Sequence, residues 1–240
     1  MSRYSLFFQF LLMTLLLHLD IPQIQAQDPI DQRLQPYIDI LDTYGEEPEN
    51  FVIGKLTDHD LLIFDDAWHP AVEPFEFYQK LIKNPSFSNK ITYIFVEAFP
   101  INKQKYIDAY LNAPQEDNKI LYPLFQDDFS GEGWPLKTYF GLMETLYYIN
   151  SGLPPESRIR VLAVNSPTYW SEISTHEDLE LFRKTLVGND YTMYKIILNA
   201  MDRFNSGQKG IFLTNTRHAY KGIKDTNGNF FWNCGTFFHQ

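Results

Sequence analysis

Four short apolar segments, separated by stretches with helical periodicity, constrain the fold of this chain more than any other feature. The segments are residues 61–64, 91–96, 159–164 and 210–213. Runs of this length and composition are typical of strands buried on both faces, and their alternation with helices predicts a parallel sheet. We therefore expect an α/β fold with a central, mostly parallel sheet flanked by helices.

The segments around these strands carry apolar residues at intervals of three and four, which predict amphipathic helices. The predicted helices cover residues 30–44, 73–83, 103–112, 135–150, 176–186 and 191–205. The acid-rich connection 115–134 is expected to be irregular. Asn227-Gly228 is a strong hairpin turn signal, so a C-terminal β-hairpin is a candidate feature.

The first 26 residues have the pattern of a secretory signal peptide. Arg3 precedes an apolar run at residues 6–19, and Ala26 offers a small residue for cleavage. The run is shorter than the roughly 20 residues that a membrane span needs, so an uncleaved anchor is only the alternative. We expect residues 27–240 to form one exported α/β domain, periplasmic or extracellular, without a stable membrane span.

Composition narrows the classes of partner. The chain has 20 basic and 30 acidic residues, a net charge of −10, and its basic residues are scattered, which disfavours nucleic-acid binding. Cys234 is its only cysteine, so no internal disulfide can form. The aromatic-rich C-terminus leaves open whether the domain is complete or truncated there, and oligomeric state is not predicted.

Each predicted strand is followed by polar or ionisable side chains. They are Asp65, Asp66 and His69 after the first strand, Glu97 after the second, Asn165 after the third, and Asn215, Arg217 and His218 after the fourth. Ligands of open parallel sheets bind at the carboxyl ends of the strands, which lie at one edge. These side chains are therefore expected to converge on one site.

Asp66 and His69 form the cluster whose chemistry is easiest to state. A carboxylate three residues before an imidazole can orient the ring and raise its basicity, which suits a base that takes a proton from water. The alternative is structural, because aspartate at such a position commonly caps a helix. The sequence of this segment does not distinguish the catalytic interpretation from the structural one.

Glu97 and His218 each have a functional and a structural interpretation. Glu97 follows an almost wholly apolar strand, so its carboxylate needs a partner, either in chemistry or in a structural pair with an arginine. His218 is a candidate second base, metal ligand or transition-state donor, and Arg217 a candidate anion-binding group. Both could equally be surface-loop residues, and Asn165 could be a simple turn residue.

The motif Asp66-x-x-His69 resembles the Glu-x-x-His motif of the erythromycin esterase-like family and its relatives, the ChaN haem-uptake proteins and the TraB/TIKI group. Glu97 is similar to the second-strand glutamate of that superfamily, and residues 191–201 and 214–218 resemble its later helix-strand-histidine block. The similarity covers about residues 50–222.

The chain also departs from this family at named positions. Relatives usually carry Gly-Glu in place of Asp65-Asp66, often an aspartate in place of Asn165, and commonly an arginine in place of Asn189 before Asp190. Charge is therefore lost at two candidate site positions. A binding protein or an inactive member is the alternative that these departures raise.

The resemblance implies cleavage of an ester or related acyl bond. We expect His69, oriented by Asp66, to activate water while His218 or Arg217 stabilises the developing negative charge. Glu97 would orient the water or the second imidazole. The cofactor is left open between none and a divalent metal held by His69, Glu97 and His218, since relatives differ in metal use.

A small-molecule or acyl substrate is expected at the rim of this site. The candidate substrate-binding residues are Asp65, Trp68, Asn165, Asn215, Arg217 and Tyr220. The alternative function is an exported protein that binds haem or another flat ligand without catalysis. Its crevice would be lined by Trp68, Phe99, Trp134 and Tyr220.

Overall fold

The computed structural model describes residues 32–66, 71–126, 136–185 and 188–239. Contacts divide the chain into two compact units, residues 1–46 and 47–240. In the described part of the first unit, a 3-10 helix leads into helix α2 (Gln35–Tyr44), and neither has a buried residue. The helix predicted near residues 30–44 is therefore present.

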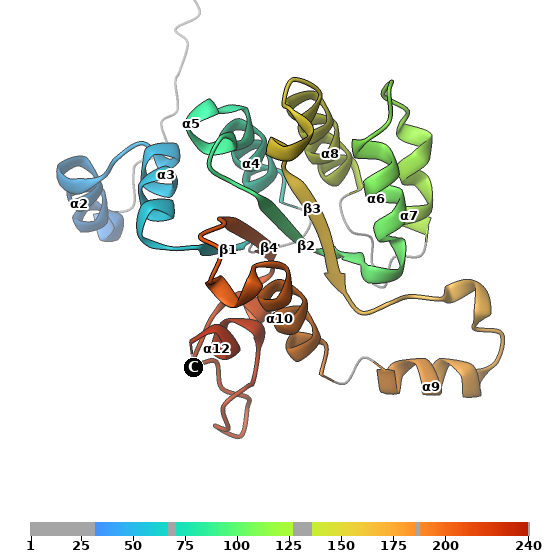
Figure 1. Ribbon diagram of the computed structural model, residues 1–240. Helices are drawn as coiled ribbons and strands as arrows, with labels where there is room; N and C mark the ends of the chain where they lie inside the picture. Colours follow the sequence, from blue (N-terminus) through green and yellow to red (C-terminus); the bar gives the residue numbers. More distant parts are fainter. Residues whose placement is uncertain (1–31, 67–70, 127–135, 186–187, 240) are drawn as a thin grey trace, which may run out of the picture. The chain divides into compact units, whose positions relative to one another are not determined.

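The second unit is built on a parallel sheet, so the predicted α/β fold is confirmed (Figure 1). Its strands among the described residues are β1 (Leu61–Asp65), β2 (Tyr93–Pro100), β3 (Arg160–Asn165) and β4 (Gly210–Thr214). They lie in the order β1-β4-β2-β3, and every pairing is parallel. The two central strands, β2 and β4, are buried along their whole length, which explains their continuous apolar sequences.

The register brings the carboxyl ends of β1 and β4 level with residues 96 and 97 of β2. Asp65 at the end of β1 pairs with Thr214 at the end of β4, and Leu213 pairs with Val96 of β2. Glu97 therefore comes one residue after the last residue of β2 that pairs with β4. This alignment determines which polar side chains can meet beyond the sheet.

Successive residues of the central strands face two different hydrophobic clusters, as the pleat of a strand requires. Ile94 and Val96 pack in the larger cluster, whereas Tyr93 and Phe95 pack in the smaller one. The larger cluster is covered by α3 (Pro48–Asp58), α4 (Glu73–Lys83), α5 (Pro85–Ser88), α6 (Gln104–Leu111), α7 (Tyr122–Gln126) and α8 (Leu136–Ser151). The smaller one is covered by α10 (Asn189–Ala200) and α12 (Cys234–Phe238), on the other face of the sheet (Figure 1).

Most predicted helices lie where their periodicity placed them, including α4, α6, α8, α9 (His176–Thr185) and α10. Helix α3 was not predicted. The expectation of an irregular connection at 115–134 is wrong for its described part, since residues 118–126 form a 3-10 helix followed by α7. Leu121 and Leu124 are buried there, so this segment belongs to the core.

The predicted C-terminal hairpin is reduced to its turn. Asp225 accepts backbone hydrogen bonds from Asn227 and Asn229, and Lys224 and Phe230 form one antiparallel bridge. The aromatic tail then forms helix α12 instead of a second strand. Asn233 begins this helix by accepting a hydrogen bond from the backbone N–H of Thr236, so its local capping chemistry determines the outcome.

Within the described part of the chain, none of the helices combines the length and the apolar character that crossing a membrane would require.

Candidate functional site

Hydrogen bonds join the ends of β1 and β4 to Glu97 of β2 near the carboxyl edge of the sheet. The backbone N–H of Asp66, just after β1, donates to the carbonyl of Thr214 at 2.9 Å. The Thr214 hydroxyl at the end of β4 donates to Oε2 of Glu97 in β2. The residues that sequence reasoning singled out on β1, β2 and β4 are thus brought together.

Glu97 is a buried carboxylate with donors on both oxygens. Oε2 accepts from the Thr214 hydroxyl and from the backbone N–H of Asn215 at 3.1 Å, and Oε1 lies 3.1 Å from Nε2 of His218. Burial acts to raise the pKa of Glu97, but the hydrogen bond from His218 and the other donors outweigh it, and the pKa is lowered. Glu97 is therefore ionised at neutral pH.

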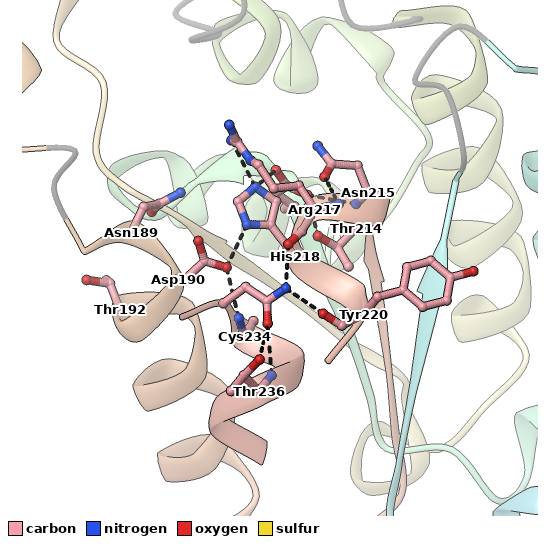
Figure 2. Close-up of polar contacts among 12 residues, drawn as sticks. Asn189, Asp190, Thr192, Thr214, Asn215, Arg217, His218, Tyr220, Cys234 and Thr236 are labelled. Carbon is pink, nitrogen blue, oxygen red and sulfur yellow. Dashed lines mark hydrogen bonds and ion pairs between the residues drawn. The ribbon is translucent and has the colours of Figure 1, made fainter. Parts of the chain in front are cut away.

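His218 lies between the carboxylates of Glu97 and Asp190. Figure 2 shows its contact with Asp190. It belongs to the short helix α11 (Thr216–Ala219) and is only 2% exposed. Its Nδ1 is 2.6 Å from Oδ1 of Asp190, while its Nε2 faces Glu97. Burial acts to lower the pKa of His218, but the bonds to Asp190 and Glu97 prevail and raise it to about 9. The ring is an imidazolium at neutral pH, with both nitrogens donating.

Asp190 contacts His218 but was not among the residues predicted for the site. It lies near the start of α10 and is buried, and its Oδ1 also accepts a hydrogen bond from the backbone N–H of Cys234 at 2.9 Å. The strand-end rule could not find it, because it does not follow a strand. The available signal was its position as the acidic residue after Asn189, where relatives in the esterase-like family commonly carry an arginine.

The residues flanking His218 shape its surroundings. Nη2 of Arg217 lies 3.3 Å from Nε2 of His218. Because the proton on Nε2 is directed to Glu97, we interpret this contact as a second cation beside the same group, not as a hydrogen bond. The side chain of Asn215, just before α11, accepts a hydrogen bond from the backbone N–H of Arg217. Tyr220, a predicted substrate-binding residue, is 54% exposed.

Asn165 connects β3 to the same site. Its Oδ1 accepts hydrogen bonds from the backbone N–H of Ser166 at 2.8 Å and from Nδ2 of Asn189 at 2.9 Å. Oδ1 of Asn189 in turn accepts from the Ser166 hydroxyl at 2.6 Å. These neutral amides hold the start of α10 beside the end of β3, which helps to place Asp190.

Tyr139 of α8 approaches the site from the larger cluster. Its ring packs against Phe75 and Phe99, with centroids 4.6 and 5.5 Å away. Burial raises the pKa of Tyr139 well above its usual value, and the negative charges of Asp66 and Glu97 raise it further. Its hydroxyl therefore keeps its proton at neutral pH, and no local sequence signal predicted that Tyr139 would lie within the influence of these charges.

His69 and Trp68 lie outside the described residues, as does Trp134. The roles assigned to them stay predictions, including the action of His69 as a base. Asp65 ends β1 beside Thr214, next to Asp66, which is buried. The described residues thus unite Asp65, Asp66, Glu97 and His218 at one edge.

Of the three predicted metal ligands, His69 lies outside the described residues and His218 is not arranged as a ligand. Both nitrogens of His218 face carboxylate oxygens as donors, whereas a metal ligand must present a free lone pair. No group of three His, Cys, Asp or Glu side chains within the described ranges could hold a metal ion. We therefore derive no step through a metal.

The aromatic crevice of the alternative binding function is not formed by Phe99. This side chain is 1% exposed and packs against Phe125 and Tyr139 in the larger cluster. It is a core residue because it lies on the inward side of the fully buried strand β2. Phe99 thus stabilises the larger hydrophobic cluster, and it does not line a ligand crevice.

Comparisons with known proteins found similarity to solved structures only. No family model matches it, and no curated protein matches its sequence. Among solved structures, it resembles bacterial protein toxins at 14% identity and a TM-score of 0.49, with 83% of this chain and 37% of the toxin chain covered. The chain thus spans little more than a third of that toxin's length.

Two further solved structures match this chain over a larger share of their own length. The type III effector HopBA1 has 12% identity and a TM-score of 0.48, with 76% of this chain and 80% of the effector covered. ChaN of Campylobacter jejuni, a structure of cofacial haem binding, has 16% identity and a TM-score of 0.46, with 72% and 77% covered. At this level we take no function from them.

Proposed function

We propose that this chain is an exported hydrolase that cleaves an ester or related acyl bond at the carboxyl edge of its sheet. The observation that carries the proposal is His218, a buried imidazolium held between Glu97 and Asp190. Strongly shifted ionisable groups at the carboxyl ends of parallel strands are typical of functional sites. The resemblance of the Asp66, His69, Glu97 and His218 pattern to esterase-like proteins supports the reaction class.

In this proposal His218 acts through its positive charge. A ring whose pKa is raised to about 9 carries its proton at neutral pH and cannot accept one from water. It can stabilise the negative charge that develops on an attacked carbonyl, together with the neighbouring guanidinium of Arg217. The structure therefore favours the charge-stabilising role over that of a second base.

The base in this proposal is His69, oriented by Asp66. Support for it comes from their spacing in the sequence and from the position of Asp66, whose backbone is bonded to Thr214 beside Glu97. Asp66 therefore lies at the edge where water would have to attack. Export is proposed from Arg3, the apolar run at 6–19 and Ala26.

The proposal is tested by a screen of ester, thioester and amide substrates with the purified chain and its His218→Gln variant. We expect turnover of at least one ester, reduced about 100-fold or more in the variant, as for loss of one group that stabilises the developing negative charge. His176→Gln is the matched control, because that side chain is 82% exposed on α9. Circular dichroism confirms that each variant is folded.

Two results would contradict the proposal. One is equal turnover in the chain and a folded His218→Gln variant. The other is no turnover of any substrate together with a stoichiometric haem absorption band, which would favour the binding function instead.

A further inference from the structure

We propose that the segment Asn233–Gly235 is a positioning element for the site, in which the backbone N–H of Cys234 holds the Asp190 carboxylate against His218. The effect of this segment on turnover rests on the proposed function. Its effect on the pKa of His218 does not, because that pKa can be measured without a substrate. The segment lies 15 or more residues beyond His218 in the chain.

Asn233 holds the backbone on both sides of His218. It is fully buried, and its Nδ2 donates to the carbonyl oxygens of Arg217 and Tyr220, each at 2.6 Å. Its Oδ1 accepts from the backbone N–H of Thr236 at 2.9 Å. One amide side chain therefore fastens α11 and begins α12, so the position of His218 depends on the start of the last helix.

Cys234 contacts the site through its backbone. Its N–H donates to Oδ1 of Asp190 at 2.9 Å, and this same oxygen lies 2.6 Å from Nδ1 of His218. Cys234 is the first residue of α12, where the N–H has no acceptor within the helix and is free to bond elsewhere. The carboxylate oxygen is thus held from two directions, and its rotation away from the imidazole is opposed.

Gly235 permits the close approach on which both contacts depend. A Cβ at this position would lie 2.2 Å from the carbonyl oxygen of Ala219, the last residue of α11. That distance is far below van der Waals contact, and the obstructing atom belongs to the backbone. Any larger residue would therefore have to push α12 away from α11.

The substitution Cys234→Pro removes the N–H and leaves the helix able to form. Proline is favoured at the first position of a helix because that N–H is unused there. The preceding residue, Asn233, already has the extended backbone that a following proline requires, with φ −120° and ψ 176°. Cys234→Ala is the matched control, since it removes the thiol but keeps the N–H.

Gly235→Ala tests the same element by a second route. The added methyl group displaces α12 without changing any charge or hydrogen-bonding group. Gly54→Ala is its control, because a Cβ at Gly54 in α3 meets nothing within 4 Å. Should Cys234→Pro fail to fold, Gly235→Ala decides the question.

The measurement is the pKa of His218, followed by NMR of histidine-labelled protein, with His218→Gln assigning the signal. We expect a fall of roughly one unit in Cys234→Pro and in Gly235→Ala, because a displaced carboxylate stabilises the imidazolium less. Cys234→Ala and Gly54→Ala should keep the pKa of the unmodified chain. On an ester substrate, kcat should fall about tenfold with KM little changed.

A folded Cys234→Pro variant whose His218 pKa is unchanged or higher would overturn the positioning role. Absence of turnover in the unmodified chain would contradict the proposed hydrolase only, because the pKa comparison does not use a substrate. Failure of one proposal is therefore distinguishable from failure of the other.

Discussion

Oδ1 of Asp190 lies 2.6 Å from Nδ1 of His218, and these two residues come from different helices 28 positions apart in the chain. With Glu97 on the other ring nitrogen, the contact stabilises the imidazolium in a buried position. Because the charged ring of His218 is buried, its pKa affects both the unfolding free energy of the chain and the proposed chemistry. Each link leads to a measurable expectation.

Stability should depend on pH through His218. Its pKa is about 9 in the folded chain against a usual 6.5, so its contribution is complete below pH 6.5 and lost as pH rises through 9. The contribution is on the order of 3 kcal/mol of unfolding free energy. Glu97, whose pKa is lowered, contributes above its usual 4.5 and loses this as pH falls. Urea denaturation should therefore show greatest stability between about pH 5 and 6.5.

His218→Gln provides the control for this pH dependence. The variant should be less stable overall, and its unfolding free energy should change less between pH 6.5 and 9 than that of the unmodified chain. Identical slopes in the two proteins would show that His218 does not carry the dependence.

Asp190→Asn should lower both the pKa of His218 and the stability of the chain. The amide keeps the shape and can still accept from Cys234, but it no longer offers a negative charge to the imidazolium. We expect a loss of about 3 kcal/mol in unfolding free energy, as for removal of one partner of a buried ion pair. NMR titration and urea denaturation measure the two effects.

The control for Asp190→Asn is Asp178→Asn, because Asp178 is an exposed carboxylate that caps α9 by accepting from Thr175. That change should leave the His218 pKa unaltered. A His218 pKa that stays near 9 in Asp190→Asn would contradict the ion pair described above.

Tyr139→Phe should preserve the core but alter the site. The ring contacts with Phe75 and Phe99 do not need the hydroxyl, so we expect a stability loss of only about 1 to 2 kcal/mol. If the hydroxyl acts near Asp66 and Glu97, turnover should fall at least tenfold. Tyr147→Phe, which removes a hydroxyl bonded to the carbonyl of Ala113, serves as the control. Equal turnover in Tyr139→Phe would remove Tyr139 from the site.

The strands and most helices could be predicted because their patterns are local. Strand β2 is a continuous apolar run, and α4 has apolar residues at intervals of three and four, so each indicates its own structure. Helix α3 was missed because Phe51, Val52 and Ile53 are consecutive and obscure the helical spacing. The prediction of a second C-terminal strand was wrong because the cap at Asn233 favours a helix over the strand pairing that the turn suggested.

The candidate site could be predicted only where a strand leads into it. Glu97 lies in β2 just beyond its pairing with β4, and His218 follows β4, and the rule for parallel sheets brings such residues together. Asp190, Tyr139 and Cys234 lie in helices, where no local signal indicates which partner they face. Their roles arise from the packing of α10, α8 and α12 around the sheet.

The alternation of buried strands and amphipathic helices was enough to determine a parallel α/β sheet with Glu97 and His218 at one edge, since periodic burial and strand direction are encoded locally. Tertiary structure alone decided the charge of His218. That charge depends on two carboxylates from separate elements lying within 3.1 Å of the ring, and such distances follow from packing rather than from any spacing along the chain.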